Sequence, residues 1–209
     1  MVTRIRRAVL AAASTVAALA AVAPSAHAGL LSLATGPCGQ RESQPFVAWG
    51  DSNDYVQVPG GTFEPGTPGW TLSGGAGVVP GNESYHVSGP GAWSLGLPAG
   101  SSAASPPACT GLDHPSARLF VRNTGSPASR LNVWASYRLA LGLPYTVYLG
   151  QVSGSASWQP SPPIEMGLLN NVLGSLTLSE STISFSFAPA DGSGDWRIDD
   201  VYLDPYHRS

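Results

Sequence analysis

The sequence has 209 residues, of which 43% are hydrophobic and only 11% are charged. This length suits one domain of ordinary size and excludes two large ones. All ten basic residues are Arg, which excludes lysine Schiff-base chemistry and a P-loop lysine, and the formal net charge of −3 provides no basic footprint for nucleic acid.

Residues 1–28 have the parts of a secretory signal peptide. Three arginines form a basic start, an apolar run extends from Ala8 to Ala23, and Ala26-His27-Ala28 gives the small residues of a cleavage site. A membrane anchor is the alternative interpretation, but the run is short and rich in Ala for a span of about 20 residues. We therefore expect a secreted or extracellular product.

Cys38 and Cys109 are the only cysteines. In an exported chain an even number of cysteines indicates a disulfide, and this one would close a loop of about 70 residues. A catalytic thiol and a metal site are the alternatives. Neither cysteine has a His at the spacing of a zinc site, which disfavours the metal.

The rest of the chain is organised as an arm and a domain of short strands. Residues 29–54 are mixed and rich in turns, which predicts an N-terminal arm laid on the domain. Residues 55–206 alternate apolar and polar positions between clusters of Gly, Pro, Ser and Asn, a pattern typical of an all-β sandwich or barrel. In chain order, the predicted strands are Tyr55–Val58, Gly61–Glu64, Trp70–Leu72, Ser84–Val87, Ala92–Leu97, Ala117–Arg122, Leu131–Leu139, Tyr145–Val152, Ile183–Phe187 and Trp196–Leu203. Leu168–Leu173 fits either a strand or a single helical turn.

Two motifs at opposite ends of this domain carry a family resemblance. The first is Val58-Pro-Gly-Gly-Thr-Phe-Glu64 followed by Pro68-Gly-Trp70, and the second is Trp196-Arg-Ile-Asp-Asp-Val-Tyr-Leu203. Together they resemble galactose-binding-like jelly-roll domains, including carbohydrate-binding modules of the family 4/9 type. The whole chain also looks like exported actinobacterial proteins of similar size, a likeness that implies no activity. The resemblance implies a jelly-roll β-sandwich of two antiparallel sheets.

The same resemblance implies a structural calcium ion held by Glu64 and by Asp199 or Asp200. Neighbouring residues of a strand point to opposite faces, so one of the two aspartates should face inward. An inward carboxylate needs a cation or several hydrogen-bond donors, and calcium prefers hard oxygen ligands. The alternative is that one Asp caps a turn or pairs with an Arg.

A candidate ligand face follows from alternation in the three middle strands. If Leu119, Val121, Leu131 and Val133 lie in the core, the opposite face receives Phe120, Asn132, Trp134, Arg138 and Tyr148. Aromatic rings stack on sugar faces, while Arg and Asn donate hydrogen bonds to hydroxyls. The resembling modules bind sugars along a concave sheet face. The alternative is that a loop, or the arm with Trp49, covers this face.

No catalytic constellation is marked in the sequence. There is no HExxH motif and no G-x-S-x-G elbow, so we expect no enzyme. Two functions remain open. One is a non-catalytic module that binds a polysaccharide or cell-envelope glycan. The other is a structural or interaction domain of the cell envelope without a small ligand.

Overall fold

The structure is a computed structural model that describes residues 40–110, 116–138, 144–166, 181–190 and 194–204. All of them belong to one compact unit, Leu33–Ser209. The predicted signal peptide and Leu168–Leu173 lie outside the described residues. No helix in the described part of the chain is long and apolar enough to cross a membrane.

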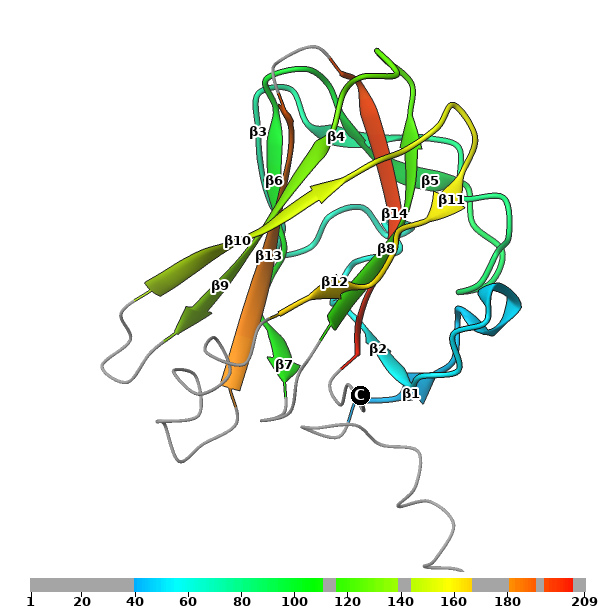
Figure 1. The fold of residues 1–209 in the computed structure, drawn as a ribbon, viewed down its shortest axis with the longest axis vertical. Helices are drawn as coiled ribbons and strands as arrows, with labels where there is room; N and C mark the ends of the chain where they lie inside the picture. Colours follow the sequence, from blue (N-terminus) through cyan, green and yellow to red (C-terminus); the bar gives the residue numbers. More distant parts are fainter. Residues whose placement is uncertain (1–39, 111–115, 139–143, 167–180, 191–193, 205–209) are drawn as a thin grey trace, which may run out of the picture. The chain divides into compact units, whose positions relative to one another are not determined.

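The strands form two antiparallel sheets that pack as the layers of a sandwich (Figure 1). The first sheet runs in the order β1 (Glu42–Ser43), β2 (Tyr55–Gln57), β14 (Trp196–Asp204), β5 (Trp93–Leu97) and β4 (Gly77–Pro80). Strand β8 (Ser116–Asn123) also pairs with β14 and carries the short strands β11 (Gln159–Pro160) and β12 (Ile164–Glu165).

The second sheet runs in the order β10 (Pro144–Val152), β9 (Leu131–Arg138), β13 (Ser181–Pro189), β6 (Ser102–Ala104) and β3 (Thr71–Ser73). Strand β7 (Ala108–Thr110) pairs with β13. The all-β sandwich expected from the sequence is therefore confirmed.

Alternation along the strands builds the core. On β13, Ile183, Phe185 and Phe187 are buried, while Ser184 and Ser186 between them are half-buried. Successive side chains of a strand point to opposite faces, so each sheet turns its apolar side inward. Trp196 of β14 lies in the same core and donates its indole N–H to Ser129 Oγ at 3.0 Å.

The opening and closing motifs lie next to each other, as predicted. Val58 donates its backbone N–H to the Val201 carbonyl at 2.9 Å, and Val201 donates to the Gly61 carbonyl at 3.2 Å. The predicted strand Gly61–Glu64 is nevertheless a turn, and Phe63 within it has a φ of 57°. Ser84–Val87 is also not a strand, because its backbone wraps around the Glu83 carboxylate.

The arm packs on the outer face of the first sheet. It contains β1 and a 3-10 turn, η2 (Val47–Trp49). The Phe46 ring stacks on Phe120 of β8, with ring centroids 5.6 Å apart, and meets Tyr202 of β14 edge-on at 5.7 Å. These residues, with Tyr55 and Trp158, form a second buried cluster separate from the main core.

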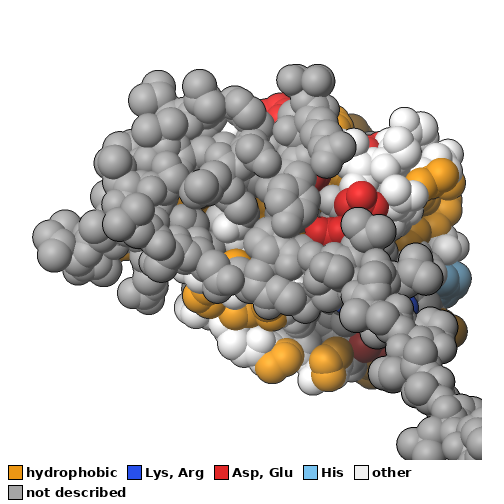
Figure 2. Space-filling model, turned by 90° about the horizontal axis from the view of Figure 1, so that it is seen from below, with side chains coloured by type: hydrophobic (Ala, Val, Ile, Leu, Met, Phe, Trp, Pro, Cys, Tyr) orange, Lys and Arg blue, Asp and Glu red, His pale blue; other side chains and the backbone are white. Residues whose placement is uncertain are grey.

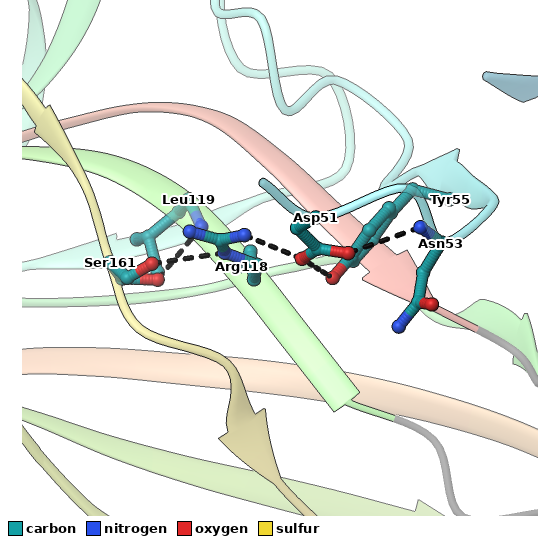
Figure 3. Close-up of polar contacts among 6 residues, drawn as sticks. All are labelled: Asp51, Asn53, Tyr55, Arg118, Leu119 and Ser161. Carbon is teal, nitrogen blue, oxygen red and sulfur yellow. Dashed lines mark hydrogen bonds and ion pairs between the residues drawn. The ribbon is translucent and has the colours of Figure 1, made fainter. Parts of the chain in front are cut away.

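One buried arginine ties the arm to β8 (Figure 3). Arg118 pairs with Asp51 of the arm and donates through Nε to the Ser161 carbonyl at 3.0 Å. Its guanidinium also lies 4.2 Å from the centre of the Phe46 ring. Asp51 accepts a second hydrogen bond from the Tyr55 hydroxyl at 2.7 Å. Strand β8 is consequently buried on both faces.

Candidate functional site

The outward face of the second sheet is the candidate ligand surface. Strand pairing places Trp134 of β9 between Tyr148 of β10 and Ser186 of β13. Ser186 in turn pairs with Ala104 of β6, which pairs with Thr71 of β3. Because these residues share a face, one row of side chains crosses all five strands. It begins with two aromatic residues and continues with three small or hydroxyl-bearing ones.

Trp134 and Tyr148 form the aromatic end of this row. Their ring centroids lie 5.5 Å apart at an interplanar angle of 52°. Tyr148 keeps 51% of its surface exposed, and Trp134 is half-buried. Two tilted, accessible rings on a flat sheet provide a platform for the apolar face of a pyranose ring.

A β-bulge in β10 sets the polar group beside this platform. The register with β9 shifts between Tyr148 and Gly150, and Gly150 has a φ of 123°. As a result Tyr148 and Gln151 both face Asn132, and each donates a hydrogen bond of 3.0 Å to its Oδ1. The side-chain carbonyl of Asn132 is thus occupied twice, which leaves its amide nitrogen as the outward donor.

Sequence reasoning missed Gln151, because strict alternation from Tyr148 puts residue 151 on the inner face. The Gly at position 150 was the available signal, since an isolated Gly inside a strand pattern often marks a bulge. Two hydroxyl groups lie next to this row on the same face: Ser136 and Thr146 are paired across β9 and β10, and their oxygens share a hydrogen bond of 2.8 Å.

The placement of Phe120 on this face was wrong. Strand β8 belongs to the first sheet, and Phe120 is fully buried beneath the arm. The alternative interpretation, in which the arm covers the aromatic residues, therefore holds for Phe120 and not for Trp134. Arg138 ends β9, but its side chain is outside the described part of the structure.

A cluster of three fully buried acids lies under the loop that follows β4. Glu83, Asp199 and Asp200 all have 0% exposed surface. Glu83 accepts backbone hydrogen bonds from Tyr85 and Val87, and its own amide donates to Asp199 at 2.9 Å. Asp200 has a left-handed φ of 47°, at a bulge where the register shifts between Asp199 and Tyr202. The bulge overrides simple alternation and buries both aspartates.

Burial and mutual repulsion raise the pKa values of the two aspartates. Loss of solvation is the main cause, and it raises the pKa of Asp199 to about 8 and that of Asp200 to about 6. The nearby Glu83 carboxylate adds to both shifts, and Asp200 also raises the pKa of Asp199. Oδ2 of Asp200 is buried without a hydrogen-bond partner.

Glu64 does not occupy the position expected for a calcium ligand. Its Oε1 accepts the backbone N–H groups of Ala92 and Trp93 at 2.8 and 2.9 Å, and the acid that reaches the Asp pair is Glu83. Among the described residues, no group of three or more His, Cys, Asp or Glu side chains is arranged to hold a metal ion.

Only one of the two cysteines lies among the described residues. Cys109 of β7 is a disulfide cysteine. Cys38, the other cysteine in the sequence, lies outside the described residues, so the Cys38–Cys109 pairing stays a prediction.

The comparisons with known proteins agree with the fold and assign no family. No model of a protein family matches the chain, and no curated protein matches it. Among solved structures, the tandem CBM22-1–CBM22-2 domain of Paenibacillus barcinonensis Xyn10C is similar with a TM-score of 0.50 and 15% identity, over 75% of this chain and 46% of that one. The chain therefore spans less than half of that tandem structure.

Two single modules show weaker likeness. The CBM22-1 xylan-binding domain of the same Xyn10C gives a TM-score of 0.49 at 15% identity, covering 75% of this chain and 97% of that one. TmCBM61, solved with β-1,4-galactotriose, gives 0.41 at 16% identity, covering 70% and 96%. The tandem domain, at a TM-score of 0.50 and 15% identity, supports a common sandwich fold and says nothing about the ligand.

Proposed function

We propose that this protein is a secreted, non-catalytic module that binds a polysaccharide across the outward face of its second sheet. The observation that carries the proposal is the pair Trp134 and Tyr148 beside the fixed amide of Asn132. Rings bury the apolar face of a sugar, and a positioned amide donates to a sugar oxygen. The row crosses five strands at about 4.8 Å per strand step, so it suits an extended chain better than a single sugar.

The accessibility of Trp134 and Tyr148 on this face favours a binding module over a purely structural domain. A structural domain would keep both Trp134 and Phe120 covered, whereas only Phe120 is covered. Figure 2 shows the molecule from below, where a few acidic side chains lie among hydrophobic and uncharged ones. The chain as a whole has a formal net charge of −3, so a neutral polysaccharide suits the aromatic row better than a strongly anionic one.

Affinity electrophoresis tests the proposal directly. Xylan and β-1,4-galactan, the polymers suggested by the similar modules, serve as probes among a panel of neutral polysaccharides. We expect at least one to retard the protein and Trp134→Ala to weaken the retardation at least tenfold. Tyr145→Ala is the matched control, because Tyr145 is an exposed aromatic residue of the neighbouring strand β10 at an inward-facing position. Equal retardation of wild type and Trp134→Ala contradicts the proposal, as does no retardation by any polymer.

We also propose that a calcium ion neutralises the acid cluster, with Glu83 taking the place predicted for Glu64. The support is a pair of carboxylates instead of a set of three: Glu83 and Asp200 are buried and interact, and Oδ2 of Asp200, which is buried without a hydrogen-bond partner, offers a hard oxygen ligand. The proposal uses the carboxylates of Asp200 and Glu83, and calcium accepts backbone carbonyls as further ligands.

Thermal unfolding with calcium and with chelator tests this second proposal. A bound ion must stabilise the native state, so chelation should lower the Tm of wild type by several degrees. Asp200→Asn should be insensitive to chelator, and Glu64→Gln should respond like wild type. An unchanged wild-type Tm on chelation overturns the proposal.

A further inference from the structure

The outer face of the first sheet carries a groove where the arm does not reach. The arm covers this sheet over β8 and the end of β14, through Phe46. Toward β4 and β5 there is instead an open groove of about 450 Å³, within the roughly 300–1,000 Å³ usual for ligand pockets. The lining residues that matter below are Gly75, Gly77, Gly96, Pro98, Asp195 and Arg197.

Glycines form the floor of this groove. Gly77 of β4 pairs with Gly96 of β5, and Gly96 pairs with Arg197 of β14. A Cβ atom added at Gly77 would meet no other atom within 4 Å, and one at Gly75 would meet only Pro98 Cγ, at 3.5 Å. Gly96 itself is buried beside Val79, whose Cγ1 would lie 3.0 Å from a Cβ atom added there. The open part of the strip is therefore the backbone at Gly75 and Gly77, where a sugar ring has room to lie.

Within the described residues, the two arginines at this strip are not paired with a carboxylate. Arg197 reaches the Pro80 carbonyl of β4 with one N–H, at 2.7 Å. Arg122 stands directly opposite on β8 and donates to the Ala156 carbonyl at 2.8 Å. The ion pair recorded among the described residues, Arg118 with Asp51, involves neither of them. Like charges directly opposite each other in a sheet are unfavourable, so a bound anion would relieve their repulsion.

Asp195 also lines this groove, where it provides a hydrogen-bond acceptor. Its Oδ1 accepts the backbone N–H of Ala99 at 3.1 Å, which holds the carboxylate by the turn after β5. From there it can accept hydrogen bonds from hydroxyl groups. The groove thus combines an open backbone strip at Gly75 and Gly77, the Arg197 guanidinium and a hydroxyl acceptor.

We propose that this groove is a second binding site, for a sugar that carries a carboxylate, namely a uronate residue of a polysaccharide. The carboxylate binds the Arg197 guanidinium, the ring lies along Gly75 and Gly77, and the hydroxyls face Asp195. Charge-assisted hydrogen bonds to a guanidinium are the stronger kind. The inference goes beyond the proposed function, because it uses the opposite sheet and requires a charged ligand.

Calorimetric titration of the exported protein tests the site with tetragalacturonate and its neutral methyl ester. We expect tetragalacturonate to bind, the methyl ester to bind at least tenfold more weakly, and added salt to weaken the acidic ligand. Arg197→Gln should weaken tetragalacturonate binding at least tenfold. Arg130→Gln is the charge-matched control and should bind like wild type, because the hydrogen bonds that its guanidinium makes to described residues go to carbonyls of its own loop, at residues 127–129.

A second variant tests the groove without changing a charged residue. Gly77→Leu fills the strip, and the open space around Gly77 predicts an unchanged Tm with at least tenfold weaker binding. The inference is overturned if wild type does not bind tetragalacturonate, or if Arg197→Gln and Gly77→Leu bind it as wild type does. Loss of that binding in Trp134→Ala would also overturn it, by moving the ligand to the other sheet. If no neutral polysaccharide binds, or if Trp134→Ala binds them as wild type does, only the proposed function is contradicted.

Discussion

Asp200 shows how much one residue with an unusual backbone can determine. Its φ of 47° lies in the left-handed region, which Asn and Asp tolerate better than other side chains. The resulting bulge brings two neighbouring acids to Glu83 in a site without solvent. Charge that is buried without compensation costs free energy, so burial favours the protonated forms of Asp199 and Asp200.

This cluster makes stability depend on pH in the calcium-free protein. The folded pKa values of Asp199 and Asp200 are about 8 and about 6, whereas both are near 3.9 in an unfolded chain. Between these limits the native state holds protons that the unfolded state has lost, so stability falls as pH rises from about 4 to 8. Each such proton contributes a slope of about 1.4 kcal/mol per pH unit.

Chemical denaturation in chelator at pH 4.5, 6 and 8 measures this slope. Asp200→Asn should reduce it below pH 6, while the left-handed backbone is kept because Asn adopts it readily. Calcium, which binds deprotonated carboxylates, should stabilise wild type more at pH 8 than at pH 4.5. A wild-type stability that rises with pH in chelator would contradict the interpretation.

Among the elements, β10 illustrates how a bulge builds a site. Without the extra residue at its bulge, Gln151 would turn to the inner face and leave Asn132 with a single donor. Gly150, at φ 123°, occupies a backbone region that side chains rarely adopt. The bulge is thus a fixed part of the candidate site rather than an irregularity of the strand.

Gly150→Val should therefore weaken polysaccharide binding and lower stability by about 1–3 kcal/mol. Gln151→Ala should weaken binding less and leave stability nearly unchanged, because Gln151 is exposed. Affinity electrophoresis and denaturation of both variants separate the two effects. Binding that survives in Gly150→Val would show that the register shift is not required.

At the scale of the whole molecule, the arm and the predicted disulfide would each attach an N-terminal segment to the sandwich. Arg118, Asp51 and Phe46 hold the arm on the first sheet, while the predicted Cys38–Cys109 bridge would tie a preceding segment to β7 of the second sheet. A bridge closing about 70 residues stabilises a fold by about 4 kcal/mol in the chain-entropy model.

Peptide mapping without reductant should yield one peptide that joins Cys38 to Cys109. Reduction should lower the Tm of wild type and leave that of the double variant Cys38→Ser, Cys109→Ser unchanged. A wild-type Tm that does not respond to reductant would mean that the bridge contributes nothing to stability.

Much of the candidate site followed from local pattern. The alternation in β9 placed Asn132 and Trp134 on one face and Leu131 and Val133 in the core, as the structure has them. Other features have no local signal. Strand β6 was not predicted, because its sequence Ser-Ala-Ala carries little of the apolar alternation that marks a strand. Strand β4 was not predicted either, because its two valines are adjacent instead of alternating with polar residues.

The sequence by itself determined the all-β class, the inward and outward positions along β9 and β13, and the meeting of the two terminal motifs. Only the tertiary structure decided that β8 joins the first sheet, that the arm buries Phe120, and that Glu83 instead of Glu64 reaches Asp199 and Asp200. Period-two patterning specifies which side of a strand faces the core. It does not specify which strand lies alongside, since pairing depends on contacts between residues far apart in the chain.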